Sequence, residues 1–240
     1  MTTPEKLTAL VLCGGAGTRL RSVIGSKPKV LATVGGRPFI DYQLALLRGL
    51  GIRDIVLATG MGADAVVRYC GQGVGYSLES EPLGTGGAIR NASGQFRSDP
   101  VLVLNGDSLV RFDLVRLIHK HLMHQARATM VLAEVPDRIR FGAVELGPDS
   151  AVIAFGEKGR TGPGFINAGA YLLGRDVIEA IPTAQAVSLE NEVFPTLVGK
   201  GLYASPVRGP FLDIGTAESY ATADDFVAAW GWPSESPCPD

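Results

Sequence analysis

The sequence predicts an α/β protein with a three-layer, Rossmann-like fold on a mixed but mainly parallel sheet. Three observations support this fold class. Short apolar runs alternate with segments of helical spacing over residues 7–135, as βαβ units require. A glycine turn, "CGGAG", follows the first apolar run directly. After residue 135 the strand-like runs become shorter, which predicts an antiparallel addition to the parallel core.

The expected elements follow in chain order. Core strands are expected at 7–12, 52–59, 74–80, 100–107 and 128–135. A helix between the first two is expected to begin at Pro38 and to end at Gly51, because proline suits a first helical position and glycine a last one. Its apolar face would be Phe39, Ile40, Leu46, Leu47 and Leu50. Strand-like runs then cover 141–146, 150–158 and 164–173, and helical spacing returns at 188–201 and 216–230.

Length and composition set bounds on organisation and partners. A chain of 240 residues with 46% hydrophobic content can form one sizeable core, so we expect a single domain over 1–230 and a flexible, Pro/Ser-rich tail over 231–240. The net charge of −2 argues against nucleic acid as a partner. The apolar stretch at the N-terminus is too short for a membrane span, and the three cysteines form no CxxC pair. These features predict a cytoplasmic protein without a membrane partner.

The stretch "LVLCGGAGTRLRSVIGSKPK" places a glycine turn and several cations directly after an apolar strand. Its glycines are Gly14, Gly15 and Gly17. Successive backbone N–H groups in such a turn can point into one concavity and bind phosphate. The stretch is not a P-loop, and Leu20 replaces the last glycine of a dinucleotide fingerprint. With Arg19 and Lys29 nearby, the charge suits a triphosphate. The alternative is a plain strand-to-helix turn with solvated basic residues.

Two aspartates end apolar runs far apart in the sequence. Asp107 follows "VLVLN", and Asp213 follows Phe211 and Leu212. The carboxyl ends of strands in open α/β sheets are where ligands bind. A lone aspartate there more often caps a turn or a helix. Two aspartates converging on a basic glycine loop predict a Mg²⁺ site beside a triphosphate.

From about residue 7 to 229 the chain resembles the sugar-phosphate nucleotidylyltransferases. "GGAGTRL…KPK" is similar to the signature loop of that family, "EPLGTGGAI" to its base and ribose loop, and "NGD" to its first metal aspartate. "GEKG" resembles the segment that meets the sugar phosphate, "NAGAY" the sugar-binding turn, and "FLDIGT" the second metal aspartate. Because the motifs occur in order, the match is more specific than any one of them. The resemblance implies the nucleotidyltransferase variant of the Rossmann-like fold.

The resemblance also implies an activity and a role for each matched residue. A sugar 1-phosphate would attack the α-phosphorus of a nucleoside triphosphate, releasing pyrophosphate and forming a nucleotide-sugar. The implied catalytic residues are Arg19 at the β/γ-phosphates, Lys29 at the α-phosphate, Lys158 at the sugar phosphate and the Mg²⁺ ligand Asp107, with Asp213 as the second ligand. The implied nucleotide-binding residues are Leu12, Gly14, Gly15, Gly17, Thr18, Arg19, Lys29, Gly84 and Thr85. The implied sugar-binding residues are Gly142, Glu157, Lys158 and Asn167.

The choice of substrates rests chiefly on the resemblance. "SEPLGTGGAI" and the compact length favour the bacterial branch that uses GTP and D-glycero-α-D-manno-heptose 1-phosphate. The alternative is a uridylyltransferase for N-acetylmuramate 1-phosphate or another hexose 1-phosphate. The chain shows no repeat-bearing extension, which argues against the uridylyltransferases with an acetyltransferase β-helix. A metal-dependent glycosyltransferase would show a DxD pair, and a non-catalytic sensor would lack one of the charged site residues.

Two groups of residues are expected to stay outside the chemistry. His119, His121 and His124 fall on an expected helix without nearby carboxylates, so we expect surface or interface residues rather than metal ligands. Cys13 is expected to line the nucleotide pocket without a redox role. A homo-oligomer is compatible with the sequence.

Overall fold

The computed structural model describes residues 3–15, 17–156, 159 and 161–231. Its strands are β1 (Thr8–Leu12), β2 (Thr33–Val34), β3 (Arg37–Pro38), β4 (Asp54–Thr59), β5 (Gly75–Leu78), β6 (Val101–Asn105), β7 (Ser108–Val110), β8 (Ala128–Val135), β9 (Val144–Leu146), β10 (Val152–Phe155), β11 (Gly164–Leu173), β12 (Leu202–Val207) and β13 (Phe211–Asp213). Its α-helices are α1 (Arg21–Ile24), α2 (Phe39–Gly49), α3 (Ala63–Cys70), α4 (Gly84–Ala92), α5 (Leu114–Met123), α6 (Arg175–Glu179), α7 (Phe194–Leu197), α8 (Ala217–Ala221) and α9 (Ala223–Trp230). Short 3₁₀ turns lie at η1 (Pro4–Lys6), η2 (Lys29–Leu31), η3 (Ser93–Gln95) and η4 (Pro148–Ser150), and η5 (Leu189–Val193) is a π-helix.

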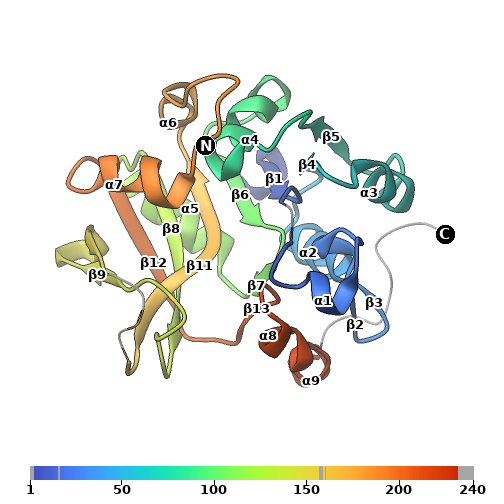
Figure 1. The fold of residues 1–240 in the computed structure, drawn as a ribbon. Helices are drawn as coiled ribbons and strands as arrows, with labels where there is room; N and C mark the ends of the chain where they lie inside the picture. The colour runs from blue at the N-terminus through green and yellow to red at the C-terminus, as the bar shows by residue number, and fades with distance from the viewer. Residues whose placement is uncertain (1–2, 16, 157–158, 160, 232–240) are drawn as a thin grey trace.

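A seven-stranded sheet in the order β12-β8-β11-β6-β1-β4-β5 forms the centre of the fold (Figure 1). The pairs β12–β8, β6–β1, β1–β4 and β4–β5 are parallel, whereas β11 runs antiparallel to both β8 and β6. This confirms the mixed, mainly parallel sheet. Strand β1 lies inside the sheet, so the glycine turn that follows it lies at the carboxyl end of an inner strand.

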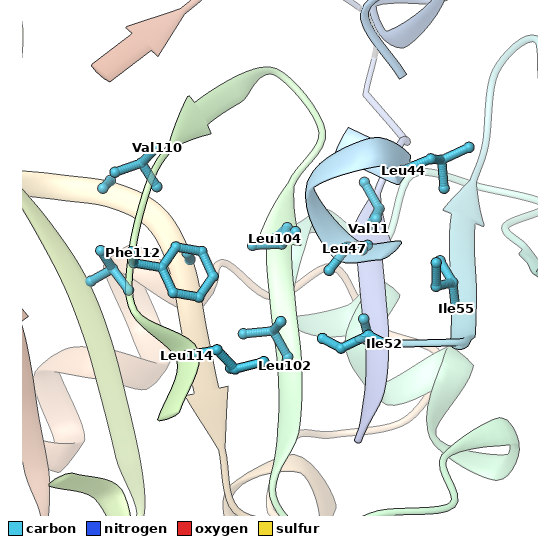
Figure 2. Packing of buried hydrophobic residues seen from close by; sticks show 14 of the residues in the cluster. Val11, Leu44, Leu47, Ile52, Ile55, Leu102, Leu104, Val110, Phe112 and Leu114 are labelled. Carbon is cyan, nitrogen blue, oxygen red and sulfur yellow. The ribbon is translucent and has the colours of Figure 1, made fainter. Parts of the chain in front are cut away.

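Helices cover both faces of the sheet. On one face, α2, α3 and α5 pack their apolar side chains against β1, β4, β6 and β11. Figure 2 shows part of this cluster. In that cluster Leu44 and Leu47 of α2 lie over Val11, and Phe112 and Leu114 lie beside β6. On the other face, α4, α6 and α7 cover the same sheet. The result is the predicted three-layer arrangement.

The C-terminal helices belong to a third apolar cluster. Val227 and Trp230 of α9 pack with Phe39 and Tyr42 of α2, and with Leu212 of β13. Strand β13 pairs antiparallel with β7 outside the main sheet. The packing of α9 therefore holds β13, the strand that ends in Asp213, in place. Asp213 is more than a hundred residues from Asp107 along the chain.

The sequence placed most elements correctly and some imperfectly. The helix expected from Pro38 begins at Phe39, with Pro38 as the preceding residue. The region 188–201 was expected to be helical, but only the π-turn η5 and the single turn of α7 form there. Likewise 216–230 divides into α8 and α9 at Thr222. The tail over 232–240 lies outside the described residues.

The prediction of surface histidines is wrong for His121. His119 is exposed, but the His121 side chain is buried, with Nδ1 2.9 Å from Oγ1 of Thr129. His124 is half-buried and stacks on Tyr203. The error arose because His121 lies on the face of α5 that packs on the sheet, where a neighbouring hydroxyl satisfies the imidazole. Within the described residues, no helix has both the length and the apolar character to cross a membrane.

Candidate active site

The candidate site begins where β1 and β6 end side by side. These strands are parallel neighbours, with Leu12 opposite Asn105, and the Gly106 N–H donates to the Leu12 carbonyl at 3.1 Å. A Cβ at Gly106 would clash with that carbonyl, so only glycine allows the two turns to approach this closely. The glycine turn and the "NGD" turn thus lie next to each other at the carboxyl edge of the sheet.

The glycine turn and the "NGD" turn enclose a cavity of about 140 Å³. It is lined by Leu12, Cys13, Gly14, Gly15, Gly17, Lys29, Val30, Thr85, Asn105, Gly106 and Asp107. Gly15 and Gly17 have φ angles of 115° and 54°, in the region that favours glycine. Thr18 is exposed and does not line this cavity. Gly17 and Asp107 therefore meet in one place, as the prediction requires.

Lys29 and Asp107 form an ion pair inside this cavity. Lys29 Nζ lies 2.8 Å from Asp107 Oδ2, and both side chains are partly buried. Residue 29 opens the 3₁₀ turn η2, where the buried side chains of Val30 and Leu31 anchor the backbone. The predicted phosphate-binding lysine and the predicted metal ligand are thus direct partners.

Asp213 reaches the same place from the far end of the chain. It lies opposite Ser108 in the β7–β13 ladder, and the Ile214 N–H donates to the Asp107 carbonyl at 2.9 Å. Burial and then the negative charge of Asp107 raise the pKa of Asp213, while the Gly215 N–H, Lys29 and Arg140 act in the opposite direction. The two carboxylates line one cavity of about 600 Å³.

This pair of carboxylates suits a divalent cation. Their mutual repulsion and partial burial are relieved by a positive ion, and carboxylate oxygens are the ligands that Mg²⁺ prefers. Among the described residues, no group of three or more His, Cys, Asp or Glu side chains gathers to hold a metal. Two protein ligands, with phosphate oxygens and waters completing the shell, match the usual manner of Mg²⁺ binding.

Gln43 stabilises the "NGD" turn through hydrogen bonds to its backbone. Its buried side-chain amide donates to the Asn105 carbonyl at 2.9 Å and also to the Ser108 carbonyl. These carbonyls flank Asp107 on either side. Sequence reasoning missed Gln43, because a glutamine among the apolar residues of an expected helix gives no sign of its partner.

A second cavity, of about 170 Å³, adjoins the phosphate cavity. It is lined by Leu12, Gly14, Gly15, Glu79, Pro82, Gly84, Thr85 and Ala88. Gly84 and Thr85, the predicted base-loop residues, lie there. Gly84 has a positive φ and packs so closely on Val187 that a Cβ would lie 2.6 Å from the Val187 carbonyl oxygen. Packing against Val187 therefore requires glycine at position 84, independently of any contact between this residue and a nucleotide base. Glu79 was not predicted.

The larger cavity lies on the other side of Asp107 and holds the described sugar-site residues. Gly142 and Asn167 line it, together with Arg19, Arg140 and Glu190. Asn167 accepts a hydrogen bond from the Gly169 N–H and donates one to the Tyr171 hydroxyl at 2.8 Å. Part of the hydrogen-bonding capacity of its side chain is therefore used within the protein.

Arg140 and Glu190 are additions to the predicted site. The Arg140 guanidinium donates to Thr216 Oγ1 at 3.0 Å, and Glu190 Oε2 accepts from Thr85 Oγ1 at 2.8 Å. The Glu190 contact links the base loop to the sugar side. Glu157 and Lys158 lie outside the described residues, so their predicted roles remain predictions.

The three cavities adjoin one another and share lining residues. Leu12, Gly14, Gly15 and Thr85 line both the base-side and the phosphate cavities, while Asn105 and Asp107 line both the phosphate cavity and the larger one. A larger cavity of about 960 Å³ lies elsewhere, between α2, α5 and the end of β12, and none of the predicted site residues lines it. Size therefore does not identify the site, whereas the convergence of charged groups and glycines does.

Comparisons with known proteins identify the family of the chain. Residues 8–229 match the family described as Nucleotidyl transferase. The D-glycero-alpha-D-manno-heptose 1-phosphate guanylyltransferase of Aneurinibacillus thermoaerophilus is 34% identical over 223 residues, covering 90% of this chain and 96% of that protein. The mannose-1-phosphate guanylyltransferase of Mycobacterium tuberculosis is 37% identical over 226 residues, but the chain spans only 63% of its length.

A solved structure extends the likeness to three dimensions. The structure of HddC from Yersinia pseudotuberculosis complexed with GMP-PN superposes with a TM-score of 0.80 at 33% identity, over 91% of this chain and 98% of that one. Because the family match covers nearly the whole chain and relatives exceed 30% identity over most of their length, the chain belongs to the nucleotidyl transferase family.

Proposed function

We propose that this protein is a sugar-1-phosphate guanylyltransferase that transfers GMP from GTP to D-glycero-α-D-manno-heptose 1-phosphate and releases pyrophosphate. The observation that carries the proposal is the convergence of the glycine turn, the Lys29–Asp107 ion pair and Asp213 on three adjoining cavities. Relatives named as guanylyltransferases of heptose and mannose 1-phosphates support the choice of base and sugar.

The chemistry needs positioning and charge compensation more than proton transfer. An oxygen of the sugar phosphate, already an anion, forms a bond to the α-phosphorus of GTP. The bond from that phosphorus to the bridging oxygen breaks, and pyrophosphate leaves with the electron pair. The protein must therefore hold two repelling phosphates in line and neutralise the charge on the leaving group.

The residues of the site divide this work. Backbone N–H groups of the glycine turn and the ammonium of Lys29 bind the phosphates, and Arg19 compensates the leaving pyrophosphate from the edge of the larger cavity. Asp107 and Asp213 would hold Mg²⁺, which supplies positive charge to the phosphate oxygens when it is bound. Lys158 is assigned to the sugar phosphate on the family resemblance.

The sugar is the less constrained half of the proposal. Mannose 1-phosphate is the second candidate, because a relative at 37% identity is named for it. The cavity of about 600 Å³ on the sugar side accommodates a hexose or a heptose phosphate, so its volume does not choose between them.

A panel assay tests the proposal. Pyrophosphate release is measured for GTP, UTP, CTP, ATP and dTTP, each with heptose, mannose and N-acetylmuramate 1-phosphates and with no sugar phosphate. We expect release only with a sugar phosphate, and kcat/KM for GTP at least about tenfold above the other triphosphates, because a mismatched hydrogen bond in a closed pocket costs that much. A preference for UTP would overturn the choice of base, and release without a sugar phosphate would overturn transfer itself.

A Lys158→Ala variant tests the assignment on the sugar side. It should impair use of the sugar phosphate and leave GTP binding close to that of the parent protein, because the removed charge is assigned to one substrate only. Loss of GTP binding with normal use of the sugar phosphate would reverse the roles given to Lys29 and Lys158.

A further inference from the structure

We propose that Arg140 is a further catalytic residue, whose guanidinium binds the phosphate of the sugar 1-phosphate and directs it towards the nucleotide. The inference rests on the proposed function, because it assumes that a sugar 1-phosphate is the second substrate. It adds a cation on the sugar side of the site, beside the one assigned to Lys158, at a position to which the sequence motifs gave no role.

Arg140 lies between the sugar side and the metal side of the site. It precedes Gly142, one of the predicted sugar-binding residues, in the loop that joins β8 to β9. Its guanidinium reaches the segment after β13, where Nη2 donates to Thr216 Oγ1 at 3.0 Å. Arg140 and Gly142 line the same cavity of about 600 Å³ as the two carboxylates, Asp107 and Asp213. The loop thus carries a positive charge from the sugar side towards the metal site.

Neighbouring contacts hold the guanidinium of Arg140 in place. Nη2 also donates to Ser219 Oγ at 3.4 Å, a hydroxyl of the capping box of α8. Cζ lies 5.5 Å from the centroid of the Phe141 ring, and that ring packs edge-on against Phe211 of β13. Because β13 ends in Asp213, one strand helps to position both the cation and the expected metal ligand.

Most donors of this guanidinium are unused. A guanidinium has five N–H donors, and both hydrogen bonds of Arg140 come from Nη2. Nη1 and Nε bond to none of the described residues, and no carboxylate among those residues forms an ion pair with Arg140. A solvated surface arginine would also lack an ionic partner, but it would not be anchored at one nitrogen. An anchored fork with free donors suits a phosphate, which offers several acceptor oxygens.

The chemistry of the transfer requires the sugar phosphate to lie where Arg140 lies. One oxygen of this phosphate attacks the α-phosphorus beside the metal carboxylates, and another oxygen is bonded to the sugar. The phosphate must therefore lie between the metal ligands and the sugar-binding loop. Burial is the main cause that raises the pKa of Asp213, and the charge of Arg140 opposes it, as expected for a cation close to that carboxylate.

The other cations of the site already have assignments. Among the described residues that line the three cavities, the cations are Lys29, Arg19 and Arg140. Lys29 pairs with Asp107, and Arg19 is assigned to the leaving pyrophosphate. Two phosphates that repel each other need positive charge on both sides of the reacting atoms. Arg140 supplies it on the side of the attacking phosphate.

An Arg140→Met variant tests the inference, because it removes the charge and keeps most of the side-chain length. Calorimetry measures the binding of heptose 1-phosphate and mannose 1-phosphate in the presence of Mg²⁺ and the α,β-methylene analogue of GTP, which cannot be cleaved at the α-phosphorus. For the sugar phosphate that the unaltered protein uses, Kd should rise by about 10- to 100-fold, because a charged hydrogen bond is lost. Kd for the GTP analogue should change by less than about threefold.

Arg97→Met is the matched control, because Arg97 is exposed and lines none of the three cavities. It should keep the Kd values of the parent protein. Unaltered binding of the sugar phosphate in Arg140→Met would overturn the proposal. Weaker binding of the GTP analogue alone would also overturn it, because Arg140 would then act on the leaving group.

The unphosphorylated sugars separate phosphate recognition from a structural role. If Arg140 only tied its loop to α8, Arg140→Met would weaken the binding of free heptose or mannose as much as that of the phosphorylated sugar. An equal loss for both ligands would therefore overturn the proposal. A loss confined to the phosphorylated sugar supports direct contact with the phosphate.

A test on the unaltered protein applies if the variant does not fold. Phenylglyoxal modifies accessible guanidinium groups, and mass spectrometry follows each arginine separately. At a concentration about ten times its Kd, the sugar 1-phosphate should slow modification of Arg140 by about tenfold, whereas the free sugar should not, and Arg97 should react at the same rate throughout. Equal rates at Arg140 with and without the sugar phosphate would overturn the inference. Absence of transfer by the unaltered protein would instead reject the proposed function.

Discussion

Nζ of Lys29 lies 2.8 Å from Oδ2 of Asp107, so one ion pair joins the lysine assigned to phosphate and the carboxylate assigned to metal. Each group neutralises the other, and each has the opposite charge to the substrate component it is assigned to bind. A triphosphate with its cation offers new partners to both at once. The pair therefore keeps both groups in place until the substrate exchanges one set of contacts for another.

The first prediction concerns Lys29. Lys29→Met should lower kcat/KM for GTP by about 100-fold or more, because a charge contact to a reacting phosphate is lost. Without the ammonium, Asp107 no longer has a competing partner for a metal ion. Mn²⁺ binding in the absence of nucleotide, measured by electron paramagnetic resonance, should therefore tighten by about two- to fivefold, because a partly exposed ion pair contributes about that much to the binding equilibrium. Lys27→Met, at an exposed position, is the control. Parent-level kcat/KM in Lys29→Met would contradict the assignment.

A second prediction follows from the repulsion between Asp213 and Asp107. The pKa of Asp213 is raised in the folded protein, so its ionised form is disfavoured there. Its contribution to stability is present at low pH and is lost as the pH rises through the raised pKa. Asp213→Asn should therefore melt no lower than the parent at pH 7.5 without Mg²⁺, while pyrophosphate release falls at least about 100-fold. A lower melting temperature, or full turnover, would show that Asp213 serves the fold and not the metal.

Gln43 is the subject of the third prediction. Gln43→Met keeps the approximate volume but leaves the Asn105 and Ser108 carbonyls without their donor. Stability should fall by about 1–3 kcal/mol in urea unfolding. Because the "NGD" turn would also loosen, the Mg²⁺ concentration for half-maximal activity should rise several-fold. An unchanged Mg²⁺ requirement would limit Gln43 to a structural role.

The fourth prediction uses the buried His121. Burial lowers the pKa of His121 to about 4, with smaller opposing effects of Asp99 and Asp176. The folded protein therefore holds this imidazole neutral. Its contribution to the free energy of unfolding is fully present above about pH 6.5 and is lost as the pH falls towards 4, by up to about 3 kcal/mol. His121→Asn, which cannot titrate, should flatten the stability curve over this range. Parallel curves for the two proteins would contradict the burial of a neutral imidazole.

The sequence predicted the parts of the site that local chemistry defines. Glycines after an apolar run, and aspartates that end apolar runs, each indicate a turn at the carboxyl end of a strand. The positions of Asp107 and Asp213 after apolar runs predicted that the two converge. The long-range contacts that bring them together, the β7–β13 pairing and the packing of α9 against α2, could not be predicted. Periodicity could not reveal that β11 enters the sheet between β8 and β6, because strand order depends on long-range pairing.

The residues that the sequence did not reveal act through tertiary partners. Gln43 lies among apolar residues of α2, and its role follows only from the carbonyls that it meets. Glu79 lies in a charged stretch, "ESE", where one glutamate points inward and the other is exposed. A charge in such a stretch is usually solvated, so composition favours the wrong interpretation for the inward one.

The most direct test of the central claim follows the two ends of GTP separately. The protein is incubated with Mg²⁺, heptose 1-phosphate and GTP labelled with ³²P at either the α or the γ position, and the products are separated by chromatography. Attack at the α-phosphorus predicts that the α label appears in the nucleotide-sugar and the γ label in pyrophosphate, with both absent when the sugar phosphate is omitted. Transfer of the γ label to the sugar phosphate, or release of the γ label as orthophosphate, would contradict the account.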